Sequence, residues 1–308
     1  MEIIMLVGIP GSGKSTVAEQ YIQQGYKVNS SDAIREQLYG KEDIQGKAPE
    51  VFQRLLQNMR NDFRAGFSCV VDASNLRRRR RSNLLSALPR CAEKKKCILV
   101  LAAPDECLKR NSERLRVVPP NRMYDMLCAF ETPFYYEGWD EINVIITGNP
   151  YVFPRKKAME FLQDNPYHSL TLGTHLDATR EYCIVHGFSE AVQEAAWYHD
   201  IGKMYTKQFV NKKGEPTETA HYYGHENYGA YLYLCEKAAR SVQNGTWTNT
   251  LYIANLINWH MQTINKWQQV PGSEIKDRTL MGERMYRETI QLHCADVEAH
   301  RKGDKNDE

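Results

Sequence analysis

The chain has 308 residues, of which 42% are hydrophobic and 25% are charged, a composition typical of globular proteins. This length suits about two domains that each bury a core, which excludes a small disulfide-stapled scaffold. Apolar runs such as residues 97–104 are far shorter than the roughly 20 residues that span a bilayer, so we expect a soluble protein.

The formal net charge of +2 hides a difference between the two halves. Residues 1–150 contain 22 basic and 18 acidic residues, whereas the remainder contains 18 and 20. The first half is therefore the better candidate for a phosphate-rich partner, although so mild an asymmetry does not by itself indicate nucleic acid. The eight cysteines form no CxxC pair and the chain begins with a strand-like segment, so we expect reduced thiols and a cytoplasmic location.

The first half alternates short apolar runs with longer segments of helical spacing. Residues 2–8, 69–73, 97–103 and 143–146 are typical of buried parallel strands. Helical spacing is found in residues 14–24, 33–38, 49–65, 77–88 and 105–115. This alternation predicts an α/β domain with a parallel sheet and helices on both faces.

Residues 147–157 contain a glycine, two prolines and a basic triplet, and we interpret them as a linker. Beyond them, residues 174–185, 189–198, 224–239, 248–261 and 280–300 are expected to be helices, and no segment is a convincing strand. The sequence thus predicts an α/β domain over residues 1–150 and an all-α domain over residues 151–308.

Residues 8–15, Gly-Ile-Pro-Gly-Ser-Gly-Lys-Ser, match GxxxxGK[ST] in full, directly after a strand and before a helix. The glycines let backbone N–H groups curl around a phosphate, Lys14 reaches the β and γ oxygens of a nucleoside triphosphate, and the Ser15 hydroxyl ligates Mg²⁺. We expect the cofactor-binding residues here to be Gly11, Ser12, Gly13, Lys14, Ser15 and Thr16.

Two carboxylates follow at strand ends. Asp32 is placed at the carboxyl edge of the sheet with Arg35 one helical turn later, so Asp32 suits removal of a proton from an acceptor hydroxyl while Arg35 holds an acceptor phosphate. The alternative for Asp32 is a helix N-cap, but the neighbouring phosphate loop favours the catalytic role. Asp72 ends a strand where a carboxylate serves Mg²⁺ or orients a basic residue.

Two groups of arginines are further candidates for phosphate contact. Arg110 and Arg114 lie one helical turn apart, a spacing suited to clamping a phosphoryl group, although a solvated helix face with Glu113 is the alternative. The five consecutive arginines at residues 77–81 fit a backbone-tracking patch for RNA or DNA and a solubilising surface equally well.

Four motifs in this order resemble the kinase domain of polynucleotide kinase/phosphatase repair enzymes, over roughly residues 1–146. They are the phosphate loop, Ser31-Asp32-x-x-Arg35, Val71-Asp72-Ala73-Ser74-Asn75-Leu76, and Arg110-Asn-x-x-Arg114 followed by Val118-Pro119. The wording Asp-Ala-Ser-Asn departs from the usual Asp-Thr-Asn of that family.

The resemblance implies a role for each of these side chains. Lys14 and Ser15 would bind ATP·Mg²⁺, Asp32 would be the general base on a 5′-hydroxyl, and Arg35 would contact the acceptor's phosphate. Arg114 would stabilise the transition state from a lid, and Asp72 would steady Arg35.

All nine histidines lie in the second half, a distribution that indicates a metal site. His175, the pair His199-Asp200, His225, His260 and Asp296 follow one another on five expected helices. Imidazole and carboxylate together suit divalent transition metals, and one carboxylate can bridge two ions with its two oxygens.

The order H…HD…H…H…D, with Tyr-His-Asp-Ile-Gly-Lys at 198–203 and Gly-His-Glu at 224–226, resembles the HD-domain metal-dependent phosphohydrolases over about residues 164–301. The resemblance implies one metal on His175, His199, Asp200 and Asp296 and another near Asp200, His225 and His260. Water would attack phosphorus while Lys203 neutralises the phosphate. His221 is a weaker candidate for phosphate contact, and we interpret His168, His186, His293 and His300 as surface groups or groups around the ligands.

The two resemblances together imply a bifunctional RNA end-healing enzyme. An ATP- and Mg²⁺-dependent kinase would phosphorylate the 5′-hydroxyl of an RNA or DNA end, and a phosphohydrolase using Mn²⁺, Fe²⁺, Co²⁺ or Ni²⁺ would clear a 2′,3′-phosphate. Sealing would need a separate ligase. Two alternatives stay open: a small-molecule or nucleoside kinase fused to an HD nucleotidase or phosphodiesterase, and an RNA-binding sensor whose HD domain has lost its chemistry.

Overall fold

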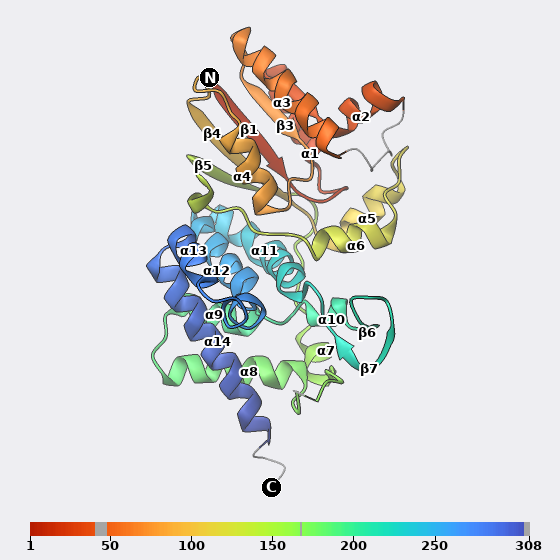
Figure 1. Cartoon of the computed structure of the whole chain (residues 1–308). Coiled ribbons are helices and arrows are strands. Elements are labelled where there is room, and N and C mark those ends of the chain that lie inside the picture. The colour runs from red at the N-terminus through yellow and green to blue at the C-terminus, as the bar shows by residue number, and fades with distance from the viewer. Residues whose placement is uncertain (41–47, 167, 305–308) are drawn as a thin grey trace. The chain divides into compact units, whose positions relative to one another are not determined.

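The computed structural model describes residues 1–40, 48–166 and 168–304, and its chain divides into two compact units (Figure 1). The first unit comprises Met1–Met123 and Pro133–Asn149, and the second comprises Tyr124–Thr132 and Pro150–Glu308. Residues 124–132, which the sequence analysis assigns to the first domain, group with the second unit. Among the described residues, no helix is long and apolar enough to cross a membrane.

The first unit contains a five-stranded parallel sheet with the strand order β2-β3-β1-β4-β5 (Figure 1). The strands are β1 (Glu2–Val7), β2 (Lys27–Ser30), β3 (Cys69–Asp72), β4 (Lys94–Leu101) and β5 (Glu141–Ile146). This confirms the predicted parallel sheet. The short edge strand β2 is the strand that Asp32 was expected to follow, but its bounds were not predicted, because its sequence Lys-Val-Asn-Ser has a single apolar residue and carries no clear period.

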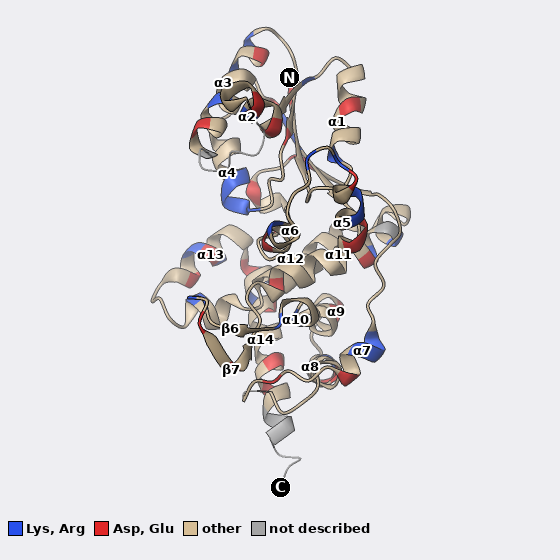
Figure 2. Ribbon diagram, turned by 90° about the vertical axis from the view of Figure 1, so that its right-hand side faces the viewer, with Lys and Arg blue, Asp and Glu red and all other residues tan. Residues whose placement is uncertain are grey.

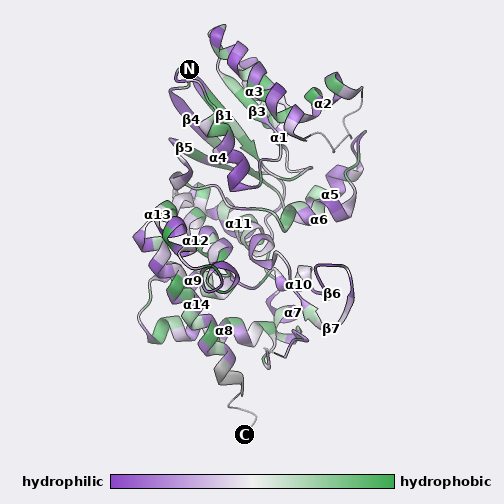
Figure 3. Cartoon of the chain, viewed as in Figure 1, coloured by the Kyte–Doolittle hydropathy of each residue, from purple (hydrophilic) through white to green (hydrophobic). Residues whose placement is uncertain are grey.

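Both faces of the central strand β1 are buried, as the predicted layering requires. Ile4 and Leu6 pack against Val17 and Ala18 of α1, while Ile3 and its alternate neighbours on the opposite face are also fully buried. Figure 3 shows β1 hydrophobic along its length. The helices of this part of the chain are α1 (Lys14–Gln23), α2 (Ser31–Tyr39), α3 (Ala48–Arg64), α4 (Arg78–Ser86), α5 (Pro104–Ser112), α6 (Pro120–Leu127) and the 3₁₀ turn η1 (Tyr135–Glu137).

The second unit is mainly helical, and each of its five expected helices is present with end shifts of a few residues. Its elements are α7 (Arg155–Glu160), α8 (Leu172–Val185), α9 (Glu190–Tyr198), α10 (Lys203–Thr206), α11 (His225–Gln243), α12 (Trp247–Trp259), the π-helical turn η2 (Thr263–Trp267), α13 (Ser273–Met281) and α14 (Glu283–Asp304). Helix α12 is buried on several sides, with Leu251, Ile253 and Leu256 almost fully inaccessible, which places it at the centre of the core.

Two expectations for this half are wrong. The unit is not all-α, because β6 (Gln208–Val210) and β7 (Pro216–His221) form an antiparallel hairpin. Its turn is held by Asn211, whose side-chain oxygen accepts from the backbone N–H groups of Lys213 at 2.9 Å and Glu215 at 3.0 Å. The expected linker 147–157 also overlaps a helix, because α7 begins at Arg155.

Residues 124–132 are an internal part of the second unit. Phe130 is fully buried and packs edge-on against Tyr231 of α11, with ring centroids 5.1 Å apart. The Asn258 amide group donates to the Phe130 carbonyl at 3.0 Å and accepts from the Thr132 N–H at 2.9 Å. Asn227 donates to the Cys128 carbonyl at 2.8 Å. These bonds fix the segment to α11 and α12.

Candidate active sites

The phosphate-type loop lies between β1 and α1, in a conformation that requires its glycines. Gly11 and Gly13 have φ angles of +81° and +96°, a region that disfavours other residues. A Cβ atom on Gly11 would lie 2.3 Å from the Cys107 carbonyl oxygen. Lys14 folds back over the loop and donates to the Ile9 carbonyl at 2.9 Å. The motif therefore has the close backbone packing expected of a phosphate-binding loop.

Two side chains from later elements hold this loop in place. The Thr147 hydroxyl, which follows β5, donates to the Ser12 carbonyl at 2.8 Å. Arg110 of α5 donates to Thr147 Oγ1 at 2.8 Å and to the Gly11 carbonyl at 3.4 Å. Arg110 was predicted to contact the cofactor, whereas Thr147 was not predicted, because its only signal in the sequence is its position at a strand end.

Charges of opposite sign meet beside the loop. Burial lowers the pKa of Lys14 and raises the pKa of Asp72, and the attraction between the two groups opposes both shifts. Asp32 and Arg114 also act on both groups. Asp32, Asp72 and Arg114, predicted from three separate segments, are thus near enough to Lys14 to form one electrostatic site.

Asp32 is not the cap of its helix. The cap of α2 is Ser30, whose Oγ accepts from the N–H groups of Asp32 at 3.3 Å and Ala33 at 3.4 Å. The Asp32 carboxylate instead accepts from Arg35 Nη1 at 2.7 Å and pairs with Arg116 Nη1 at 3.1 Å, and its side chain is 41% exposed. An accessible carboxylate between two guanidinium groups fits an acceptor that carries both a hydroxyl and a phosphate.

Arg35 and Arg114 differ from expectation in their surroundings. Arg35 donates to Asp32 and to the Ser31 carbonyl, so its described partners are on its own helix rather than at Asp72. Arg114 is not one helical turn from Arg110, because α5 ends at Ser112. Asn111 closes the following loop by donating to the Val118 carbonyl at 2.8 Å and accepting from its N–H at 3.1 Å, which leaves Arg114 exposed outside the helix.

The run of five arginines divides into side chains with different roles, although all colour the start of α4 blue in Figure 2. Arg81 is fully buried and forms a two-pronged ion pair with Glu137 at 2.7 and 2.6 Å. Arg78 donates to the Tyr136 hydroxyl at 3.4 Å. The run is therefore not one uniformly exposed surface, because Arg81 is buried whereas Arg77 and Arg79 are exposed.

In the second unit, four predicted side chains converge on one point. His175 Nε2 of α8 lies 3.2 Å from His199 Nε2, 3.4 Å from Asp200 Oδ2 and 3.1 Å from Asp296 Oδ1 of α14. His199 Nε2 lies 3.3 Å from Asp200 Oδ2 and 3.5 Å from Asp296 Oδ1. All four are buried, and we call them the first cluster.

The second oxygen of Asp200 belongs to another group, the second cluster. His225 Nε2 lies 3.0 Å from Asp200 Oδ1 and 3.3 Å from His260 Nε2, and His260 Nε2 lies 3.6 Å from the same oxygen. Asp200 therefore faces one group of imidazoles with each oxygen, which is the bridging geometry expected from the His-Asp pair.

The ring tautomers of these histidines suit metal coordination. The Nδ1 atoms of His199, His225 and His260 lie 2.8, 2.7 and 2.7 Å from the backbone carbonyls of Ala196, Tyr222 and Ile257. A carbonyl only accepts, so each Nδ1 carries a proton, and each ring can offer the lone pair of Nε2 to a metal once Nε2 holds no proton.

The spacing of the atoms also fits an ion. Ligands about 2.1 Å from a common ion lie about 3.0–3.4 Å apart for octahedral and tetrahedral angles. Most separations in the two clusters fall within this range, and the two longest, 3.5 Å for His199–Asp296 and 3.6 Å for His260–Asp200, lie just above it. His175 Nε2 and His199 Nε2 lie 3.2 Å apart, a contact that is favourable only with a proton or a metal cation between the two nitrogens.

The electrostatics of the clusters also demand positive charge. Burial by itself would raise the pKa of Asp200, but Lys203 and His199 hold it well below the ordinary value. Burial would likewise lower the pKa of His199, but Asp200 and Asp296 raise it to about 10. The carboxylates thus remain ionised and attract either protons or a cation.

Of the histidines outside the two clusters, some lie next to the first cluster and others lie away from it. His168 and His300 lie beside His175, with ring centroids 5.7 and 4.8 Å from it, whereas His186 stacks on Tyr182 at the exposed end of α8. His221 stacks on Tyr223 next to the hairpin. Lys203 is buried against Asp200 at 2.6 Å.

Comparisons with known proteins match the N-terminal half. The family model described as AAA domain matches residues 3–133. An L-seryl-tRNA(Sec) kinase of Methanococcus maripaludis is 25% identical over 178 residues, which are 55% of this chain and 68% of that protein. A gluconokinase structure from Sinorhizobium meliloti is 21% identical with a TM-score of 0.36, over 48% of this chain and 84% of that one. A sugar kinase structure from Janibacter is 21% identical with a TM-score of 0.37 and the same two coverages.

The N-terminal half has the parallel-sheet α/β fold of a P-loop domain and is similar in sequence to a kinase. The full loop motif, the parallel sheet and the family match agree on this assignment. The helical C-terminal half holds groups of histidine and aspartate side chains with metal-binding geometry.

Proposed function

We propose that this protein heals the ends of broken RNA with two active sites, one that phosphorylates a 5′-hydroxyl and one that removes a 2′,3′-phosphate. The observation that carries the acceptor choice is the position of Asp32 between Arg35 and Arg116. A carboxylate beside guanidinium groups matches a 5′-hydroxyl whose nearest neighbour in the chain is a phosphodiester.

In the kinase site, ATP binds with its phosphates in the loop of residues 8–15. The Ser15 hydroxyl would help to hold Mg²⁺, which would supply positive charge to the β and γ oxygens. Lys14 contacts the same oxygens, and Asp32 accepts the proton of the attacking hydroxyl. Arg35 and Arg116 hold the acceptor's phosphate, and Arg114 approaches the transferring group from the loop after α5.

A relative supports an acceptor hydroxyl carried on RNA. The name L-seryl-tRNA(Sec) kinase describes a substrate in which a seryl residue is attached to tRNA. Arg80, on the helix that follows β3, belongs to the same cationic surroundings: burial lowers the pKa of Arg80, and the nearby charge of Arg35 lowers it further. A neutral sugar acceptor would bring no phosphate to these positive charges.

In the second unit, the proposed activity is that of an HD-type phosphohydrolase. His175, His199, Asp200 and Asp296 would hold one divalent transition metal, and Asp200, His225 and His260 would hold another. Such ions polarise a phosphoryl oxygen and activate water for hydrolysis. The chain orients the imidazoles through the carbonyls of residues 196, 222 and 257, and Lys203 keeps Asp200 ionised.

The test uses a short RNA with 5′-hydroxyl and 2′,3′-cyclic phosphate ends, incubated with ATP, Mg²⁺ and added Mn²⁺, Co²⁺ or Ni²⁺. Wild type should phosphorylate one end and clear the other. Asp32→Ala should lower the kinase rate by a factor of about 100 or more and leave hydrolysis unchanged, because a general base contributes that much. Asp200→Ala should show the reverse, and Arg79→Ala, an exposed member of the arginine run, is the matched control.

Two results would replace the proposal. If nucleosides or nucleotides are turned over and RNA ends are not, the protein is a small-molecule kinase joined to a nucleotidase. Acceptor binding that is insensitive to salt would agree with that outcome, because a polynucleotide releases counterions and a nucleoside does not. A second unit that binds no transition metal would instead favour an RNA-binding sensor without hydrolase chemistry.

A further inference from the structure

The contacts of Lys203 fix the protonation of a neighbouring histidine. Its ammonium group lies 2.6 Å from Asp200 Oδ2, 3.0 Å from Gln163 Oε1 and 3.1 Å from His168 Nε2. An ammonium group has three protons and no lone pair, so each of these contacts uses one proton. His168 Nε2 is therefore the acceptor of its contact.

A neutral imidazole that accepts at Nε2 carries its proton on Nδ1. This Nδ1 atom is buried and has no hydrogen-bond partner among the described residues. A buried donor without an acceptor is costly, so the position suits an acceptor supplied by a ligand. His168 comes from the loop before α8, which also carries Gln163.

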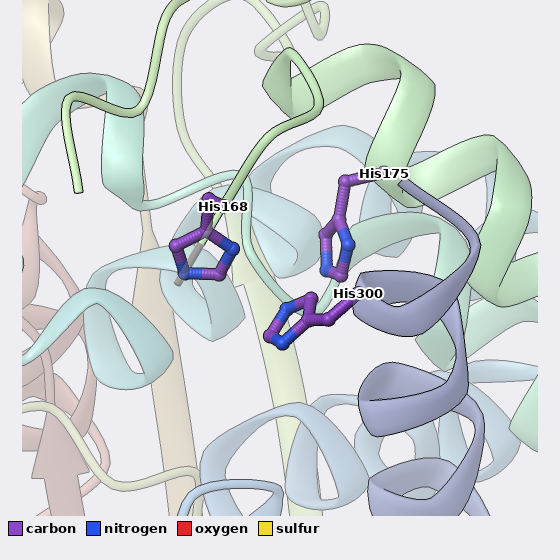
Figure 4. A group of neighbouring side chains, drawn as sticks. All are labelled: His168, His175 and His300. Atoms are coloured by element: carbon purple, nitrogen blue, oxygen red, sulfur yellow. The ribbon is translucent and has the colours of Figure 1, made fainter. Parts of the chain in front are cut away.

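The unpartnered nitrogen faces the first cluster. Figure 4 shows one ring nitrogen of His168 on the side toward His175 and His300, and the other on the far side. The His168 ring lies edge-to-face with His300 at a centroid distance of 4.4 Å. His300 Nε2 is also buried without a hydrogen-bond partner and lies 3.4 Å from Asp296 Oδ1.

These three imidazoles do not make a third metal site. His168 Nε2 is occupied by Lys203, and its Nδ1 carries a proton and has no lone pair to offer. His175 Nε2 already belongs to the first cluster. What remains is a directed N–H donor at the edge of that cluster, and its natural acceptor is an anionic oxygen.

We propose that His168 is a substrate-binding residue, whose Nδ1–H donates to a non-bridging oxygen of the phosphoryl group that the second unit hydrolyses. The proposal rests on the hydrolase activity proposed above. It also assigns Lys203 a positioning role: Lys203 does not contact the phosphate but fixes the tautomer of His168 and the orientation of Asp200.

The experiment titrates inorganic phosphate into the full chain loaded with Mn²⁺ and measures Kd by calorimetry for four variants. Asparagine places its amide near the position of Nδ1, and glutamine near that of Nε2. His168→Asn should therefore bind phosphate within about threefold of wild type, whereas His168→Gln and His168→Ala should weaken it by about tenfold or more, the scale of one hydrogen bond to a charged group. His186→Ala, an exposed histidine on the same helix region, should not change Kd.

Metal content, measured by mass spectrometry on the same samples, separates the possible failures. His168→Ala should keep the metal content of wild type, and loss of one ion would make the three imidazoles a metal site and overturn the proposal. Equal phosphate affinity in all variants, or glutamine binding as well as asparagine, would also overturn it. If the variants behave as expected but no phosphate ester is hydrolysed, the hydrolase proposal fails and the assignment of His168 as a phosphate donor stands.

Discussion

Replacing Arg81 by methionine should destabilise the first unit strongly. Both members of the Arg81–Glu137 pair have fully buried side chains, and Arg81 also donates to the carbonyls of Asn75 at 3.0 Å and Leu76 at 2.8 Å. The substitution leaves a buried carboxylate whose remaining described donor is Trp139 Nε1 at 3.1 Å.

Removal of one partner from a buried pair costs about 3–5 kcal/mol. For a unit of about 140 residues, this corresponds to a fall in Tm of about 10–15 °C. The assay is differential scanning calorimetry of the full chain, with the transition of the first unit identified by its upward shift when ATP is added.

Two further variants make the reasoning refutable. Arg79→Met removes an exposed arginine from the same run and should change the free energy of unfolding by less than about 0.5 kcal/mol. The double variant Arg81→Met/Glu137→Gln removes the uncompensated charge but keeps an acceptor for Trp139, so it should regain about 2 kcal/mol. If Arg81→Met costs no more than Arg79→Met, the buried pair does not stabilise this unit as described.

Three other predictions concern the loop, the thiols and the metal clusters. Gly11→Ala should weaken ATP binding at least about tenfold by calorimetry, because its Cβ would lie 2.3 Å from a carbonyl oxygen at a φ of +81°, and an unchanged Kd would contradict the packing of the loop. Burial and Asp62 raise the pKa of the buried Cys69 thiol to about 12, whereas Cys294 is exposed. A disulfide reagent at pH 8 should therefore label Cys294 rapidly in the native protein and Cys69 only after unfolding. Labelling of both thiols at the same rate would refute this. The carboxylates of Asp200 and Asp296 raise the pKa of His199 to about 10, so this ring is protonated at pH 7.5 in the metal-free site. Binding of Mn²⁺ should therefore release about one proton and become tighter as the pH rises toward 10. Calorimetry in two buffers of different ionisation enthalpy measures the number of protons released, and a value of zero would contradict the prediction.

The residues of the two clusters could be predicted from the sequence because all nine histidines lie in the second half and the candidate ligands follow one another on, or at the ends of, five expected helices. His199 and Asp200 are adjacent in the chain, so their shared direction follows from local geometry. Each oxygen of Asp200 faces a different group of imidazoles. This arrangement depends on how five helices pack, so the spacing of residues in the sequence does not predict it.

Long-range partners account for most of what the sequence did not indicate. Arg81 is indistinguishable from its four neighbours until Glu137, 56 residues away, is brought to it. Arg116 and Thr147 have ordinary local contexts and gain their positions from Asp32 and from the phosphate loop. The hairpin after α10 was missed because its first strand has three residues, too few to display a period of two.

The path of residues 124–132 has a consequence for how the two proposed activities can be separated. Because the chain leaves the first unit at residue 123 and returns at 133, the second unit is assembled from two pieces of the polypeptide. A fragment starting at Pro150 would lack Phe130, and Asn258 would lose both the carbonyl and the N–H that its amide group now satisfies. A single cut in the chain therefore cannot separate the two units intact. Point substitutions are the way to remove one proposed activity and keep the other.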